Sequence, residues 1–133
     1  MDNFRPHGLS LYGNTLAAIN HPKQRGIEAE SIEMFSISET GIEHKKTLIS
    51  SLLESPNDLV LVAEDRLYIG NDSMFNSNIS SFEKIQEQLG RPYSTIVFYD
   101  GIDMTIASRN LASVSGLNLT KDCLLYTSDA ADE

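Results

Sequence analysis

Three short polar segments begin in the same way and recur at similar intervals along the chain. They are His7-Gly8-Leu9-Ser10, Asn57-Asp58-Leu59-Val60 and Ser115-Gly116-Leu117-Asn118, whose starts lie 50 and 58 residues apart. Intervals of about 40–50 residues are typical of the blades of a β-propeller. Because the first strand of every blade lines the central channel, we expect these segments to meet at one axis. Imidazole, amide and carboxylate groups brought together there could bind a metal ion and carry out acid–base chemistry.

The elements between these segments read as short strands. Period-2 alternation with glycine-containing turns predicts an all-β chain. The expected strands are His7–Tyr12, Thr15–His21, Ser31–Ser38 and Ile42–Ile49 in the first unit, and Leu59–Ala63, Arg66–Gly70, Thr95–Tyr99 and Ile102–Ser108 in the second. These units predict one blade over about 7–50, a second over about 57–109, and the start of a third over about 115–122. A helical insertion is expected near 81–90, between Ser81 as N-cap and Gly90-Arg91-Pro92.

The expected extent of the propeller is partial. Closed propellers have about 4–8 blades, and repeat units do not bury their apolar faces alone. We therefore expect residues 1–122 to be a propeller fragment of about two blades and one strand. Residues 123–133 resemble a translated sequencing adapter, and we interpret them as a non-native tail. The single cysteine, Cys123, lies in that stretch and supports no redox or nucleophile hypothesis.

Composition narrows the classes of partner. The 133 residues carry a formal net charge of −9 and are 41% hydrophobic, which indicates a globular chain without the basic surface that nucleic acids or anionic membranes require. No apolar run approaches the roughly 20 residues that span a bilayer. Residues Met1 to Pro6 lack the apolar core of a signal peptide, and the compartment stays open.

Five ordered motifs carry a resemblance to a known family. They are Arg5-Pro6-His7-Gly8-Leu9-Ser10, Ile19-Asn20-His21-Pro22, Ser55-Pro56-Asn57-Asp58-Leu59, Tyr68-Ile69-Gly70-Asn71-Asp72 and Ser115-Gly116-Leu117-Asn118. Together they resemble the paraoxonase/arylesterase family, within the gluconolactonase-like six-bladed propellers. The resemblance implies a parent enzyme that hydrolyses small lactones or aryl esters and holds two Ca²⁺ ions in its channel.

The resemblance also implies a set of metal ligands. Asn57 matches a ligand of the catalytic calcium, Asp58 matches a ligand of the structural calcium, and Leu9 would offer that ion its backbone carbonyl. Such a mixture of hard oxygen donors suits Ca²⁺. Ser115 stands where the family has an asparagine ligand, so its part in the metal site is in question. On the residues alone, Asn57-Asp58 could equally be a turn that precedes a strand.

The catalytic and substrate-binding residues follow from the same resemblance. His7 and His21 match a histidine pair in which one imidazole takes a proton from water and the other orients it. The metal would polarise the carbonyl that this water attacks. Asn71, Asp72 and Ser73 match the substrate-binding segment, although Ser73 replaces a histidine of well-known relatives. Without the resemblance, both histidines could be ordinary polar residues beside strands.

Two other readings of function stay open. The chain could come from a gluconolactonase-like or strictosidine-synthase-like propeller enzyme, or from a non-catalytic propeller that binds partners. Ser73 and Ser115 favour the last reading, because each replaces a chemically useful side chain. We also expect the chain as given to be inactive, because acidic ligands from other blades are missing. His44, beside Lys45 and Lys46, is expected to face solvent.

Overall fold

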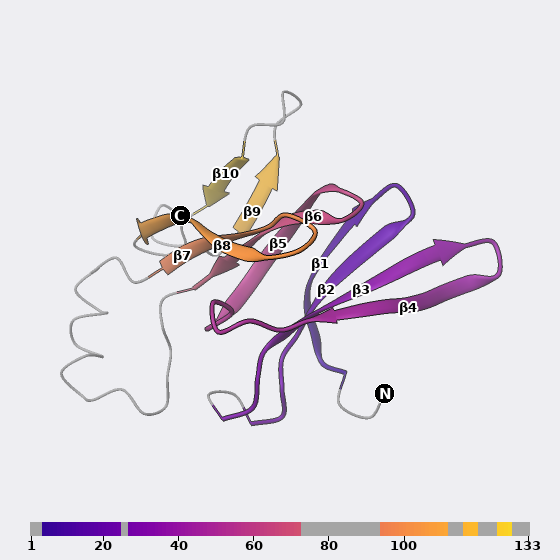
Figure 1. Ribbon diagram of the computed structural model, residues 1–133, viewed down its shortest axis with the longest axis horizontal. Coiled ribbons are helices and arrows are strands. Elements are labelled where there is room, and N and C mark those ends of the chain that lie inside the picture. Colours follow the sequence, from indigo (N-terminus) through magenta and orange to yellow (C-terminus); the bar gives the residue numbers. More distant parts are fainter. Residues whose placement is uncertain (1–3, 25–26, 73–93, 112–115, 120–124, 129–133) are drawn as a thin grey trace.

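The computed structural model describes residues 4–24, 27–72, 94–111, 116–119 and 125–128, and this part of the chain is all-β. Two four-stranded antiparallel sheets and one hairpin make up the fold (Figure 1). The first sheet contains β1 (Pro6–Tyr12), β2 (Thr15–Asn20), β3 (Ser31–Ser38) and β4 (Gly41–Leu48). The second contains β5 (Pro56–Ala63), β6 (Arg66–Asn71), β7 (Ser94–Tyr99) and β8 (Met104–Leu111), and the hairpin pairs β9 (Gly116–Leu119) with β10 (Leu125–Ser128).

Each sheet follows chain order, so every strand pairs with the one before it. This meander is the arrangement of a propeller blade, and the predicted all-β propeller fragment is confirmed. The expected helix near 81–90 lies outside the described residues. Within the described ranges, no helix is long and apolar enough to cross a bilayer.

One turn differs from the sequence prediction. The Asp100-Gly101 pair predicted a tight hairpin with the next strand starting at Ile102, whereas β8 begins at Met104. Asp100 Oδ1 accepts hydrogen bonds from the backbone N–H groups of Ile102 and Asp103, both at 2.8 Å. The Asp100 N–H donates to the Asp103 carbonyl at 3.1 Å. These bonds close a longer turn, in which Gly101 has a φ of 100°, a conformation that glycine adopts without strain.

The main apolar core lies between the two sheets. Alternate residues of each strand point to the same face, and the inward-pointing ones of both sheets pack into one cluster. The cluster contains Ala17, Ile19, Ile32, Met34 and Leu48 from the first sheet, Leu59, Leu61, Leu67, Ile69, Val97 and Tyr99 from the second, and Leu53 between them. Burying each large aliphatic side chain contributes about 1.5–3 kcal/mol. This burial stacks the two sheets face to face, as blades stack in a propeller.

The opposite face of the second sheet packs against β9. Ile96 and Leu117 form a second buried cluster, with Val60 and Tyr68 beside them. The first strands of the successive units, β1, β5 and β9, are therefore neighbours (Figure 1). Polar bonds join them as well, since Ser10 Oγ accepts the Leu61 N–H at 2.9 Å. This arrangement places β1 against β5 and the described residues of the third segment, 116–118, against β5 as well.

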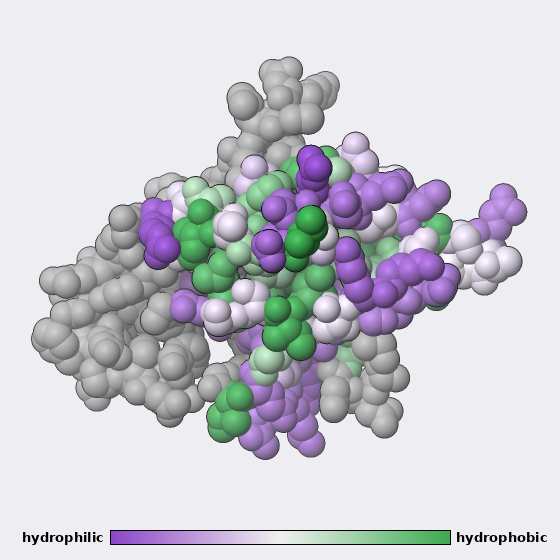
Figure 2. All heavy atoms as spheres, in the orientation of Figure 1, coloured by the Kyte–Doolittle hydropathy of each residue, from purple (hydrophilic) through white to green (hydrophobic). Residues whose placement is uncertain are grey.

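The described surface is mixed in polarity, with exposed apolar side chains such as Ile27, Ile42 and Ile102. Figure 2 shows hydrophilic side chains gathered over the β3–β4 hairpin, where Glu43 and Lys45 form an exposed ion pair at 3.1 Å. Such exposed pairs contribute little to stability. The fold is therefore held by burial between the sheets, and the outer hairpin is its solvated rim.

Candidate functional site

Two β-bulges place the polar segments at the start of the inner strands. In β1, two residues, His7 and Gly8, oppose one residue of β2, because Pro6 pairs with Asn20 and Leu9 with Ala18. In β5, Asn57 is the extra residue, because Pro56 pairs with Asn71 and Asp58 with Gly70. A bulge locally twists a strand and re-aims its side chains. The repeated sequence pattern thus corresponds to a repeated backbone irregularity.

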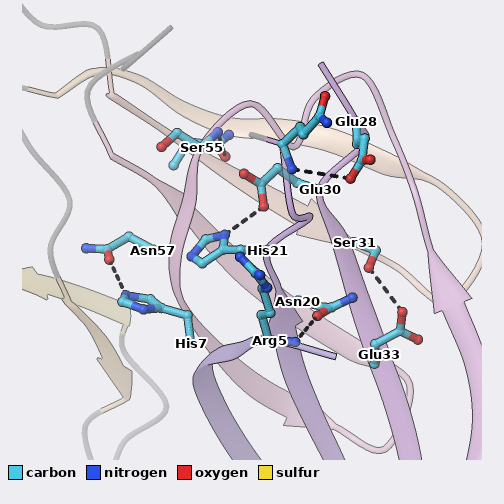
Figure 3. A network of polar contacts seen from close by, with 12 residues as sticks. Arg5, His7, Asn20, His21, Glu28, Glu30, Ser31, Glu33, Ser55 and Asn57 are labelled. Atoms are coloured by element: carbon cyan, nitrogen blue, oxygen red, sulfur yellow. Dashed lines mark hydrogen bonds and ion pairs between the residues drawn. The ribbon is translucent and has the colours of Figure 1, made fainter. Parts of the chain in front are cut away.

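His7 and Asn57 meet across the two blades. The His7 Nε2 and Asn57 Oδ1 atoms lie 2.9 Å apart (Figure 3). Because an amide oxygen only accepts hydrogen bonds, the His7 Nε2–H group is the donor. Gly8 allows this approach: a Cβ there would lie 3.2 Å from the Asn57 carbonyl oxygen and 3.3 Å from the Asp58 Cα. Residues 50 positions apart are thereby brought into one site.

His21 lies beside His7. The two ring centroids are 4.9 Å apart, with an interplanar angle of 47°. His21 Nδ1 is 2.7 Å from Glu30 Oε2, and the Glu30 side chain is only 5% exposed (Figure 3). We call His7, His21, Glu30 and Asn57 the histidine cluster. The two predicted histidines are therefore adjacent, and each ring contacts a side-chain oxygen, that of Asn57 for His7 and that of Glu30 for His21.

Backbone bonds fix the ends of β1 and β2 beneath these rings. The Arg5 N–H donates to Asn20 Oδ1 at 2.6 Å, and the His21 N–H donates to the Arg5 carbonyl at 3.2 Å. Both bonds extend the β1–β2 pairing past the bulge. They hold His21, which directly follows β2, close to His7 on β1.

Asp58 connects the second blade to β9. Its Oδ1 accepts the Leu59 N–H and its Oδ2 accepts the Leu117 N–H, both at 2.8 Å. A carboxylate has about four lone-pair positions, so oxygen donor capacity for a cation remains at Asp58. Leu9, the predicted backbone ligand, lies in β1 with its side chain 60% exposed.

The donor types near the inner strands suit a hard cation, while their number is small. Asn57 and Asp58 offer amide and carboxylate oxygens, whereas Ca²⁺ takes 6–8 oxygen ligands. Across the described residues, no three His, Cys, Asp or Glu side chains gather as a metal-binding group. Ser115, the third predicted side-chain ligand, lies outside the described part of the chain.

The predicted substrate-binding residues divide between two settings. Asn71 is 1% exposed, and its amide is used within the blade. Its Oδ1 accepts the Ser55 N–H at 3.2 Å, and its Nδ2 donates to the Leu52 carbonyl at 2.7 Å and to Thr95 Oγ1 at 3.0 Å. Asp72 follows it, and its N–H donates to the Ser55 carbonyl at 2.9 Å. Ser73 lies outside the described residues.

The structure adds residues that the sequence analysis missed. Glu30 had no motif or periodic signal, because it precedes β3 at the end of an irregular loop. A second cluster surrounds Glu33, whose carboxylate contacts Ser31 Oγ at 3.1 Å, Thr47 Oγ1 at 2.5 Å and His44 Nε2 at 2.7 Å. We call these four residues the Glu33 cluster. His44 is 39% exposed, as expected, but its ring is also bound to this buried carboxylate.

The sequence comparisons point to one protein family. The family model described as Arylesterase matches residues 1–133. The chain belongs to the arylesterase family. Serum paraoxonase/arylesterase 2 of Gallus gallus is 31% identical over 138 residues, and serum paraoxonase/lactonase 3 of Homo sapiens is 29% identical over 137 residues. Serum paraoxonase/arylesterase 1 of Homo sapiens is 27% identical over 130 residues.

The coverage of these arylesterase relatives is unequal on the two sides. The three alignments include 98%, 96% and 92% of this chain, but only 37%, 37% and 35% of the respective relatives. The chain therefore spans a little over one third of the length of the curated proteins it matches. The family assignment covers the whole chain.

Proposed function

We propose that this chain supplies the histidine pair of a propeller enzyme that hydrolyses small aryl esters or lactones. One observation carries the proposal: the ring centroids of His7 and His21 lie 4.9 Å apart, and each ring has an oxygen partner. Asn57 binds His7 Nε2, and Glu30 binds His21 Nδ1. The names of the relatives, paraoxonase, arylesterase and lactonase, support an ester or lactone as the substrate class.

The proposed reaction is general-base hydrolysis. A neutral imidazole of the pair accepts a proton from water as the water oxygen attacks the carbonyl carbon. The carbon–oxygen bond to the leaving group then breaks, and the proton passes to the departing oxygen. The products are a carboxylic acid and an alcohol or phenol, or a hydroxy acid from a lactone. Packing against the partner ring would hold the reacting imidazole in orientation.

We propose that calcium completes the site. Asn57 would be a side-chain ligand of a catalytic ion, and Asp58 and the Leu9 carbonyl would be ligands of a structural ion, with Ser115 in place of a family asparagine. The support is the chemistry of the donors and the position of Asn57 beside His7. When bound, the catalytic ion would polarise the substrate carbonyl.

The substrate segment follows the same proposal. Asn71, Asp72 and Ser73 would be the substrate-binding segment, with Asn71 as the last residue of β6. Asn71 would anchor this segment, because its amide binds Ser55, Leu52 and Thr95. Asn71 therefore positions the segment, and substrate contact falls to the residues after it.

The test is a hydrolysis assay with an aryl acetate and a lactone, with calcium and with a chelator. It is run on the 133-residue chain and on the longest form of the protein that cells make. We expect turnover by the longest form and none by the chain alone, since the described residues supply few metal ligands. His7→Asn and His21→Asn should each lower kcat by about 100-fold or more, the usual range for a general base.

A matched histidine serves as the control. His44→Asn changes a histidine that binds a carboxylate but lies in the Glu33 cluster, so kcat should be unchanged. A folded, calcium-binding protein that hydrolyses neither probe would instead support the non-catalytic propeller.

A further inference from the structure

We propose that Glu30 is the positioning residue of the histidine pair: it fixes the proton of His21 on Nδ1 and leaves Nε2 free to accept. The inference deepens the proposed function, since it names the group that sets the protonation state of one ring. The observation is the 2.7 Å contact between His21 Nδ1 and Glu30 Oε2 (Figure 3).

The chemistry of imidazole gives this contact its consequence. A neutral imidazole has one N–H, and an ionised carboxylate only accepts hydrogen bonds. A Glu30 carboxylate at 2.7 Å therefore favours the tautomer with hydrogen on Nδ1, whose other nitrogen carries a lone pair. A hydrogen bond to a charged group is worth about 1.5–3 kcal/mol, which corresponds to a roughly tenfold or larger change in tautomer ratio.

Burial shows that the contact is part of the packed site. Glu30 is 5% exposed and His21 is 15% exposed, although Glu28 and Ala29, its chain neighbours, are exposed. Burial of a carboxylate is costly unless it is hydrogen-bonded. The loop between β2 and β3 thus turns one acidic side chain inward, and that side chain lies on the ring next to His7.

The ring geometry gives Glu30 a role beyond packing. His7 donates from Nε2 to Asn57 Oδ1, and His21 donates from Nδ1 to Glu30. In the neutral rings, His7 therefore carries its hydrogen on Nε2 and His21 carries its hydrogen on Nδ1. The other nitrogens, His7 Nδ1 and His21 Nε2, are unprotonated. Glu30 keeps the hydrogen of His21 away from Nε2.

The experiment reads the tautomer directly. The ¹⁵N-labelled 133-residue chain is studied by ring ¹H–¹⁵N correlation near pH 8.5, about two units above the usual histidine pKa of about 6.5. His21 signals are identified by their loss in His21→Gln. We expect the Nδ1–H form to dominate at His21, and Glu30→Ala to shift the tautomer ratio at least tenfold toward Nε2–H.

Two controls separate this effect from charge and folding. Glu28→Ala removes one negative charge from the same loop and should leave the His21 tautomer ratio unchanged. The Glu28 carboxylate accepts the Gln24 N–H at 3.3 Å, a contact within the loop. The His44 ring signal reports on the Glu33 cluster and should stay constant in both variants. Glu30→Gln, which keeps an oxygen acceptor without charge, should give an intermediate ratio.

The outcomes distinguish this inference from the proposed function. An unprotonated His21 Nδ1, or an unchanged tautomer ratio in folded Glu30→Ala, overturns the role of Glu30 whatever the hydrolysis assay gives. A tautomer shift without hydrolysis by any form of the protein supports Glu30 and overturns the ester-hydrolase proposal. Where hydrolysis occurs, Glu30→Ala should lower kcat about 10–100-fold, the range found for groups that orient metal-bound histidines, with KM unchanged.

Discussion

The first blade contains two histidine–glutamate pairs with the same contact distance and different surroundings. His21–Glu30 and His44–Glu33 both measure 2.7 Å, and each glutamate is 5% exposed. His21 is 15% exposed and lies against a second histidine. His44 is 39% exposed and lies edge-on to Phe35, with ring centroids 5.3 Å apart. The same histidine–carboxylate contact therefore occurs in two different surroundings within one blade.

The difference lies in where each glutamate stands in the fold. Glu33 is the third residue of β3, between the core residues Ile32 and Met34, so it points to the opposite face of the sheet. There its carboxylate binds side chains of β3 and β4. Glu30 precedes β3 and binds a ring at the inner strand ends. Glu33 connects β3 to β4, whereas Glu30 orients the His21 side chain.

The largest stability effect should come from Glu33→Ala. The change leaves Ser31 and Thr47 without their carboxylate partner and should reduce the free energy of unfolding by about 2–3 kcal/mol. Urea denaturation measures it. Glu43→Ala on β4, which removes an exposed partner of Lys45, should cost no more than about 1 kcal/mol. Equal losses in both variants would show that the Glu33 cluster does not join the strands.

Gly8→Ala should disturb the histidine cluster and spare the Glu33 cluster. The new Cβ would lie 3.0 Å from Ile19 Cδ1 and 3.2 Å from the Asn57 carbonyl oxygen, so these neighbours must shift by a few tenths of an ångström. Overpacking of this kind costs about 1–3 kcal/mol. Ile19→Val removes the Cδ1 atom and should recover part of the loss in the double variant, measured as a coupling energy.

Ring signals of the histidines sharpen the same test. In Gly8→Ala the His7 signal should move, because Asn57 shifts relative to the His7 ring, while the His44 signal stays in place. A shift of His44 as large as that of His7 would contradict the separation of the two clusters.

The sequence predicted the blade pattern well, because it depends on local signals. Alternation and turn residues located all eight strands of the two sheets to within a few residues, and the first strands β1 and β9 both contact β5. The contact between His7 and Asn57 follows from that repeat. The strands and the repeated polar motifs could be predicted because each depends on a short stretch of sequence.

The parts that could not be predicted depend on tertiary contacts. The bulges at His7 and Asn57 need the partner strand to be defined, since a bulge is a mismatch between two strands. The inward turn of Glu30 and the binding of His44 to Glu33 have no local sequence signal. The interpretation of residues 123–133 as a translated adapter stays a prediction, although Leu125–Ser128 pairs with β9.

Thr47→Val tests the same cluster through pH. Burial raises the pKa of Glu33, but hydrogen bonds from Thr47, His44 and Ser31 outweigh it and hold the pKa below its usual 4.5. A lowered carboxyl pKa stabilises the fold above about pH 4.5, and this contribution is lost as pH falls through the folded-state pKa. Thr47→Val should cost about 0.5–1 kcal/mol at pH 7 and less at pH 3. Thr105→Val, at an exposed position on β8, is the matched control.

Asp100→Asn should give the smallest effect and separates hydrogen bonding from burial. Hydrogen bonds from the N–H groups of Asp103 and Ile102 hold the pKa of Asp100 below 3.8, yet its side chain is fully exposed. Asparagine keeps an oxygen acceptor for both N–H groups, so the turn should survive and the unfolding free energy at pH 7 should change less than in Thr47→Val. NMR titration checks the wild-type pKa, and urea denaturation checks stability. Equal losses of unfolding free energy in Asp100→Asn and Thr47→Val would show that the burial of Glu33 adds nothing to the effect of the hydrogen bonds on its carboxylate.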